Sequence, residues 1–153
     1  TAPALTISIH QNSYHEEAIN GGQVFYYKTS EKGKRLADIL QKRFDFVLGE
    51  NNRRQAKPND TYYLLLHVKS PIVIVECGFL SNWDEAARLN STDYQDRLAW
   101  TLHMGILRYL NTRNCSVPSQ LRAKIHSKSA VPIGFLPSIL SFLTVSAVNA
   151  QTY

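Results

Sequence analysis

Residues 71–82, with the sequence PIVIVECGFLSN, constrain the fold of this chain more than any other segment. The β-branched run at 72–75 predicts a strand that is buried on both faces. This run is followed by a carboxylate, Glu76, and then by a turn glycine, Gly78. Because burying an ionised carboxylate is costly unless it is paired or binds a cation, Glu76 is a candidate site residue.

A second apolar strand is followed by a residue that can bind a metal. Residues 4–9 predict this strand, and His10 comes directly after it. If it runs parallel to the strand at 71–77, His10 and Glu76 emerge at the same carboxyl edge of the sheet, where α/β enzymes place their sites. One histidine and one carboxylate fit a catalytic zinc centre, in which three protein ligands leave room for a water and a further carboxylate acts as base. From the residues alone, purely structural roles for both side chains stay open.

The sequence up to residue 111 predicts helices interleaved with apolar strands. Ser30 is a good N-cap for a helix with apolar residues at helical spacing, and Asn82 can cap another. Such interleaving indicates an α/β domain with a mixed sheet flanked by helices. The predicted elements are strands at 4–9, 22–27, 61–68 and 71–77, helices at 30–47, 83–90 and 91–111, and a basic loop at 49–60.

The net charge of +5 is concentrated at one end of the chain of 153 residues. Residues 113–153 contain four basic residues and no acidic one, so the preceding part is nearly neutral. A nearly neutral domain argues against nucleic acid as a partner. The two cysteines, Cys77 and Cys115, are expected to be free thiols, because they make neither a disulfide framework nor a zinc-finger spacing.

The tail at 112–153 differs in composition from the rest. Residues 129–153 carry no charge, and an apolar stretch at 131–148 follows three basic residues. The layout is like that of a secretory signal, but it lies at the wrong end of the chain. Three interpretations stay open, namely an extension without packed structure, a membrane-associating tail, and a docking segment.

Two segments resemble signatures of a known enzyme family. Residues 8–12 (SIHQN) and 75–82 (VECGFLSN) are similar to segments of the zinc-dependent N-acetylmuramoyl-L-alanine amidases, the type 3 cell-wall amidase family. Residues 22–27 (GQVFYY) resemble the family's glycine-plus-aromatic strand, 63–66 (YLLL) the strand before the catalytic one, and 94–110 its closing helix. The resemblance covers about residues 4–111, and the subgroup that it suggests is the spore-cortex amidases of endospore formers.

The resemblance implies a reaction and a set of roles. His10 would be a ligand of Zn²⁺, and Glu76 would be the catalytic glutamate that deprotonates the zinc-bound water. The family hydrolyses the amide between N-acetylmuramic acid and the L-alanine of the peptidoglycan stem peptide, in the cell envelope or outside the cell. Asn12 would lie at the site rim or merely form a turn. Arg53 and Arg54 would meet stem-peptide carboxylates or belong to a solvated loop.

The sequence also departs from the family pattern. The family's other two zinc ligands lie upstream of the segment that matches His10, where this chain has nine residues. The chain therefore resembles the C-terminal two-thirds of an amidase domain, cut at its start and lacking its first strand and helix. We expect an incomplete zinc site and an inactive chain when it is alone. A non-catalytic cell-wall or partner-binding fragment is the alternative function.

Overall fold

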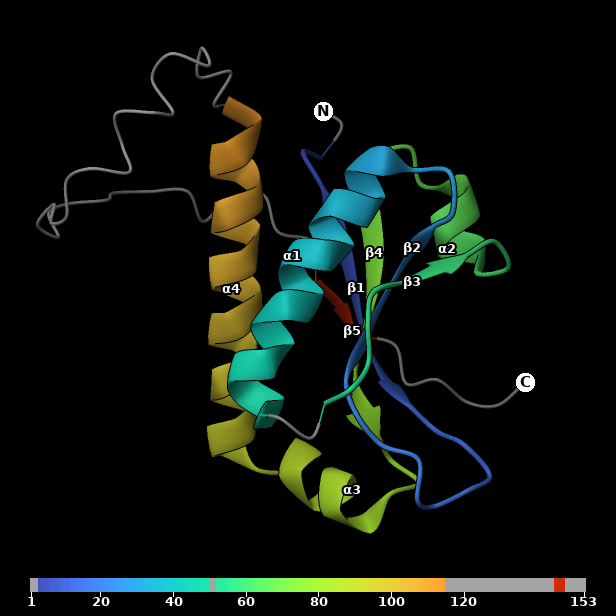
Figure 1. Cartoon of the computed structure of the whole chain (residues 1–153), viewed down its shortest axis with the longest axis vertical. Helices are drawn as coiled ribbons and strands as arrows, with labels where there is room; N and C mark the ends of the chain where they lie inside the picture. Colours follow the sequence, from blue (N-terminus) through green and yellow to red (C-terminus); the bar gives the residue numbers. More distant parts are fainter. Residues whose placement is uncertain (1–2, 50–51, 115–144, 148–153) are drawn as a thin grey trace, which may run out of the picture.

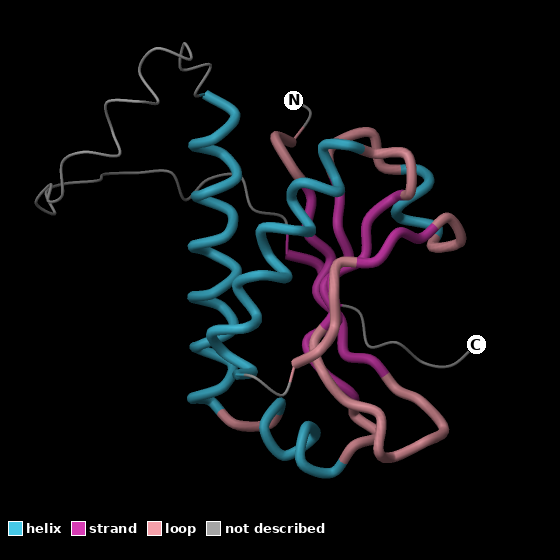
Figure 2. The backbone as a smooth tube through the Cα atoms, in the orientation of Figure 1, coloured by secondary structure: helices cyan, strands magenta, loops and turns pink. Residues whose placement is uncertain are grey.

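The structure is a computed structural model, which describes residues 3–49, 52–114 and 145–147. Within these residues, five strands form one mixed sheet, and helices lie on both of its sides (Figures 1 and 2). The predicted α/β fold with a mixed sheet flanked by helices is confirmed. The strands are β1 (Thr6–Asn12), β2 (Gln23–Tyr27), β3 (Lys57–Asn59), β4 (Ile72–Phe79) and β5 (Val145–Ala147), and the helices are α1 (Glu31–Leu48), α2 (Tyr63–His67), α3 (Trp83–Leu89) and α4 (Thr92–Asn114).

Strand β4 is the centre of the sheet, whose order is β3-β2-β4-β1-β5. It pairs in parallel with β1 and antiparallel with β2, and it is buried along its whole length. A strand that is covered on both faces needs an unbroken apolar run, and residues 72–75 supply one. The prediction made from this run is confirmed.

The larger core lies between the sheet and the pair α1 and α4, which lie side by side along one face (Figure 1). The strands contribute Val24, Val73 and Val75, all of them fully buried. Because side chains alternate along a strand, Cys77 also lies on this helix-covered face, where it is a buried free thiol. The helix residues that fill this core include Leu36, Leu40, Phe44, Leu98, Leu102 and Tyr109.

The opposite face of the sheet carries a small apolar cluster of Phe25, Leu65, Ile72 and Ile74. Leu65 comes from α2, which covers one part of this face. At the next position of β4 on the same face stands Glu76 rather than an apolar residue. Helix α2 covers only part of this face, and a polar side chain replaces an apolar one at Glu76. This face of the sheet can therefore hold an active site.

The prediction of a strand at 61–68 is wrong, because residues 63–67 form the helix α2. The side-chain oxygen of Asn59 accepts hydrogen bonds from the backbone N–H groups of Thr61 and Tyr62 and turns the chain there. Leu65 alone in this helix is buried, and Tyr63 is 71% exposed. The short apolar run had the composition of a strand, but its burial has the one-sided pattern of a helix.

Two short strands arise where none was expected. Residues 57–59 of the predicted loop form β3, which pairs in parallel with β2 at the edge of the sheet. Pro58 fits there because an edge strand leaves one side of its backbone without partners. Strand β5 pairs in parallel with β1 and comes from the apolar tail.

The remaining expectations for the tail fall on residues 115–144 and 148–153, which lie outside the described residues. Helix α4 continues to Asn114, and the division of the chain into parts at 1–111 and 112–153 stays a prediction. Among the helices of the described residues, none combines the length and the apolar composition needed to cross a membrane.

Candidate active site

His10 and Glu76 stand directly opposite each other in the parallel pair of β1 and β4. Paired residues of neighbouring strands point to the same face of the sheet, so the two side chains share one face at the carboxyl end of both strands. Gln23 is opposite Glu76 on the other side, in the antiparallel pair of β2 and β4. The expected meeting of His10 and Glu76 at one edge is thus confirmed, and Gln23 joins them.

The carboxylate of Glu76 is buried without full hydrogen bonding. The residue is 7% exposed, and its Oε2 atom has no hydrogen-bond partner among the described residues. Burial disfavours the charged form and raises the pKa of Glu76 to about 7. A carboxyl with this pKa can both take and return a proton near neutral pH, which is the property that a general base needs.

The imidazole of His10 is held by a neighbour on its own strand. Its Nε2 atom lies 2.6 Å from the hydroxyl of Ser8, which occupies the same face two residues earlier. Burial lowers the pKa of His10, which favours the neutral ring that a metal requires. With Nε2 engaged by Ser8, Nδ1 is the ring nitrogen that remains for a metal.

Hydrogen bonds tie the two signature segments together beyond the strands. The backbone N–H of Leu80 donates to the carbonyl of Asn12, at 2.7 Å. As predicted, Asn82 caps α3, and its side-chain oxygen accepts from the N–H of Glu85 at 3.0 Å. The side-chain amide of Asn82 also donates to the carbonyl of Glu17, at 2.8 Å. The loops after β1 and β4 are therefore held against each other.

Glu85 is a positioning residue that sequence reasoning did not identify. It is 3% exposed, and its two carboxylate oxygens accept from the backbone N–H groups of Gly21, at 3.0 Å, and Phe79, at 2.8 Å. Arg88 lies 3.3 Å from the same carboxylate. From the sequence, Glu85 indicated only a favourable charge in the first turn of a helix. Its partners are distant in sequence, so no local pattern predicts them.

Arg54 lies beside the site and is joined to it through Gln23. Its Nη1 atom donates to Gln23 Oε1 at 3.3 Å, and its Nε donates to the carbonyl of Asn20 at 2.6 Å. The guanidinium also stacks over the ring of Phe79, at 4.6 Å. Burial lowers the pKa of Arg54, and the charge of Glu85 opposes that shift. Gln23 is a second residue that sequence reasoning missed.

The other predicted rim residues differ in their surroundings. Arg53 is exposed, and no contact within the described residues ties it to the site. The side-chain oxygen of Asn12 accepts from the N–H of Ser13, at 2.8 Å, which is a local turn interaction. Burial, and then the negative charge of Glu76, raise the pKa of Tyr62.

The described residues contain no group of three or more His, Cys, Asp or Glu side chains that could hold a metal ion. His15 is exposed beside Glu16, His67 stacks on Tyr63, and His103 is exposed. His10 and Glu76 thus fit one side of a zinc centre by donor type and placement, and no third donor of the described part joins them.

The fold is that of solved N-acetylmuramoyl-L-alanine amidases. The CwlD amidase from Clostridioides difficile, in complex with the GerS lipoprotein, is 37% identical with a TM-score of 0.69, over 71% of this chain and 55% of that one. The catalytic domain of the amidase CwlV from Bacillus (Paenibacillus) polymyxa var. colistinus is 30% identical with a TM-score of 0.63, over 71% of this chain and 58% of that one.

The sequence profile of the N-acetylmuramoyl-L-alanine amidase family matches residues 1–108, and the chain belongs to this family. It is 38% identical over 109 residues to the germination-specific N-acetylmuramoyl-L-alanine amidase of Bacillus subtilis (strain 168), covering 71% of this chain and 46% of that protein. It is 31% identical over 107 residues to the amidase LytC of the same strain, covering 69% of this chain and 21% of LytC. The chain thus spans about half or less of the length of these relatives.

Proposed function

We propose that this chain is part of a peptidoglycan hydrolase of the cell envelope or the extracellular space. The hydrolase cleaves the amide between the lactyl group of N-acetylmuramic acid and the L-alanine of the stem peptide. Membership of the family supports the substrate class. The observation that carries the proposal is the unpartnered, buried Oε2 atom of Glu76 in a residue that stands opposite His10. A carboxylate buried in this way needs a cation or a proton to offset its charge.

Glu76 is proposed as the general base. Near neutral pH, its carboxylate takes a proton from the attacking water while the water oxygen bonds to the lactyl carbonyl carbon. When the carbon–nitrogen bond breaks, the same carboxyl gives that proton to the leaving amine of L-alanine. The second proton of the water leaves the new carboxyl group and protonates the amine, so the products are a lactyl carboxylate and the ammonium group of L-alanine, and Glu76 returns to its starting state.

His10 is proposed as a ligand of Zn²⁺ through Nδ1, with Ser8 fixing the ring through Nε2. When bound, zinc polarises the scissile carbonyl and stabilises negative charge on its oxygen. Because the described residues supply no group of three donors, we propose that two further ligands come from outside them. On this proposal, the chain alone does not hydrolyse peptidoglycan.

Arg54 is proposed to bind a carboxylate of the stem peptide, with Arg53 as a more exposed second cation and Asn12 at the rim. Support for Arg54 comes from its bond to Gln23, which stands opposite Glu76. Its guanidinium is already oriented by the ring of Phe79, so little side-chain freedom is lost on binding.

The test uses a longer polypeptide that supplies the missing ligands. The readout is mass spectrometry of muropeptides for the free amine of L-alanine, with zinc content measured on the same samples. Glu76→Gln should lower kcat by a factor of about 10² to 10⁴ with zinc retained. Glu31→Gln, at an exposed position of α1, is the control and should have ordinary activity. Full activity of Glu76→Gln would exclude Glu76 as the base, and unchanged zinc content of His10→Ala would exclude His10 as a ligand.

A second candidate is a non-catalytic cell-wall or partner-binding fragment. The observation that favours it is the lack of a third metal donor among the described residues. Sedimentation of the protein with intact peptidoglycan, together with zinc content and release of stem peptide, distinguishes the two functions. A longer polypeptide that binds the wall, contains no zinc and releases no stem peptide would support the second candidate.

A further inference from the structure

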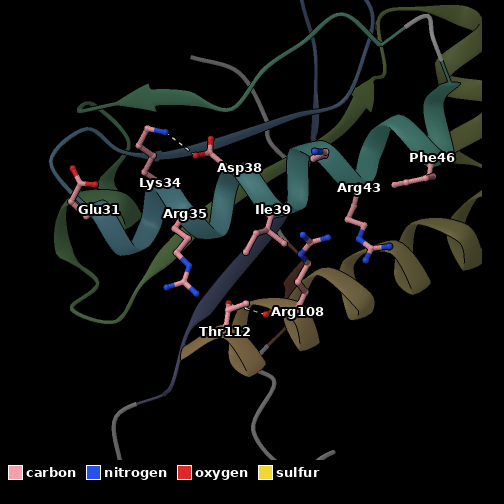
Figure 3. A pocket seen from close by; sticks show the side chains of 10 residues that line it. Glu31, Lys34, Arg35, Asp38, Ile39, Arg43, Phe46, Arg108 and Thr112 are labelled. Atoms are coloured by element: carbon pink, nitrogen blue, oxygen red, sulfur yellow. Dashed lines mark hydrogen bonds and ion pairs between the residues drawn. The ribbon is translucent and has the colours of Figure 1, made fainter. Parts of the chain in front are cut away.

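A basic groove lies between α1 and α4, on the side of these helices away from the sheet and thus away from Glu76. Its volume is about 510 Å³, and it is open to solvent. Figure 3 shows Arg35 and Arg43 reaching into it from α1 and Arg108 reaching into it from α4. Cations from two helices therefore face one shared space. The basic groove also contains Lys34 and Lys42.

Among the described residues, most of these positive charges are not neutralised by ion pairs. Lys34 pairs with Asp38 at 2.7 Å, and Glu31 is the other acidic residue that lines the groove. In the described part of the chain, no ion pair includes Arg35, Arg43, Arg108 or the neighbouring Lys42. The basic groove therefore keeps a positive excess that an anionic ligand can neutralise.

Two of the guanidinium groups are positioned by aromatic rings rather than by carboxylates. The Cζ atom of Arg35 lies 5.7 Å from the centre of the Tyr109 ring, and that of Arg43 lies 5.7 Å from the centre of the Phe46 ring. Stacking of this kind uses the flat face of a guanidinium and leaves the N–H groups at its edge able to donate. Phe46 is 79% exposed, so its ring contacts Arg43 but is not part of the hydrophobic core.

We propose that the basic groove binds a phosphodiester-linked anionic polymer, which lies along α1 and α4. Forked N–H donors on both walls match phosphate oxygens, and the concave shape admits a thin strand. Ile39 and Phe46 are the two apolar side chains among its lining residues. A protein interface needs a larger apolar centre, and a flat lipid surface does not enter a concave groove, so a polymer fits better than either.

This inference does not depend on the amidase reaction. Because the basic groove and Glu76 lie on opposite sides of the α1–α4 layer and the sheet, a polymer in the groove leaves the candidate active site open. The groove would hold the protein on an anionic polymer while the other face stays free to contact its substrate.

The test measures fluorescence anisotropy of a labelled poly(glycerol phosphate) oligomer with the 153-residue chain at low salt. The triple variant Arg35→Gln, Arg43→Gln and Arg108→Gln should bind about tenfold more weakly, because three charge-assisted contacts to phosphate are lost. The control triple variant, Lys32→Gln, Lys57→Gln and Lys69→Gln, has the same net charge, and its three positions are exposed and do not line the groove. Its affinity should stay within about twofold of the unmodified chain, and binding should weaken as salt rises.

Several results would overturn the proposal. Equal weakening in both triple variants would show general charge attraction in place of a groove. Equal or tighter binding of poly-L-glutamate of matched charge would indicate an acidic protein segment. Tighter, groove-dependent binding of vesicles with anionic phospholipids would indicate a membrane surface. Circular dichroism checks that each variant folds, and single changes at Arg43 and Arg108 replace the triple variant if it does not.

Discussion

The backbone N–H of Phe79 donates a hydrogen bond of 2.8 Å to the carboxylate of Glu85. The same carboxylate accepts from Gly21, just before β2. One side chain from α3 thus fixes the end of the strand that carries Glu76 and the start of the strand that carries Gln23. The placement of the candidate active site depends on this buried contact between three segments.

Replacing Glu85 with glutamine should destabilise the chain. Glutamine keeps one acceptor oxygen, so one of the two buried backbone N–H groups loses its partner, which costs about 1 to 3 kcal/mol. Urea unfolding followed by circular dichroism measures the change. Asp84→Asn, at the exposed neighbouring position, is the matched control and should have little effect. Equal unfolding midpoints for the two variants would contradict this role of Glu85.

Gln41 provides a second test of a buried side-chain bond. Its oxygen accepts from the N–H of Val24 at 2.8 Å, and its amide donates to the carbonyl of Gly22 at 3.0 Å. In Gln41→Leu, the Val24 N–H is left without that partner, while the Gly22 carbonyl keeps a bond from Asn52. The expected loss in the free energy of unfolding is about 1 to 3 kcal/mol. Gln55→Leu, which changes an exposed side chain, should leave the free energy nearly unchanged.

The buried carboxyl of Glu76 should make stability depend on pH. Its pKa is raised from 4.5 to about 7 on folding, so between these values the folded chain binds more protons than the unfolded chain. Stability from this group is therefore present below pH 4.5 and is lost as pH rises to about 7. The Glu76→Gln variant has no carboxyl at this position, so its stability does not fall in this way as pH rises. With a chelator present, the variant should be more stable than the unmodified chain at pH 8 by at most about 3 kcal/mol. The two proteins should converge near pH 5, and a constant difference across this range would refute the assignment.

Alanine substitutions at Gly21 and Gly49 allow the cost of backbone strain to be distinguished from the cost of a steric clash. Both have positive φ, +100° and +69°, so alanine is strained at either position. A Cβ atom at Gly21 would also lie 2.7 Å from Asn52 Oδ1, whereas at Gly49 it meets open space. Gly49→Ala should cost about 1 kcal/mol, and Gly21→Ala should cost more. Thermal unfolding of both variants checks this order, which an equal loss would contradict.

The sequence predicts the part of the site that depends on local patterns. The run at 72–75 identifies β4, and a polar residue after each of two apolar strands places Glu76 and His10 at one edge. The family signatures in the same segments agree with the match to residues 1–108. These features were predictable because strand burial and side-chain alternation repeat over a few residues.

The supporting contacts were not predictable from such patterns. The bonds of Glu85 to Gly21 and of Arg54 to Gln23 join residues that are far apart in sequence, and side-chain bonds of this kind leave no periodic signal. Helix α2 was mistaken for a strand because a short apolar run fits both. Whether this run forms a helix or a strand depends on the turn at Asn59 and on which of its side chains are buried against the sheet.

The parallel pairing of β1 with β4 also has a consequence for the order of folding. Thr6 pairs with Ile72, and α1, β2, β3 and α2 lie between these two strands in the sequence. Closing so long a loop has a large entropic cost before any pairing is gained, so this pair forms late and slowly. The candidate active site consists of residues from both strands and cannot exist before that step. Formation of the candidate active site should therefore follow the slowest phase of folding, and helix formation alone should precede it.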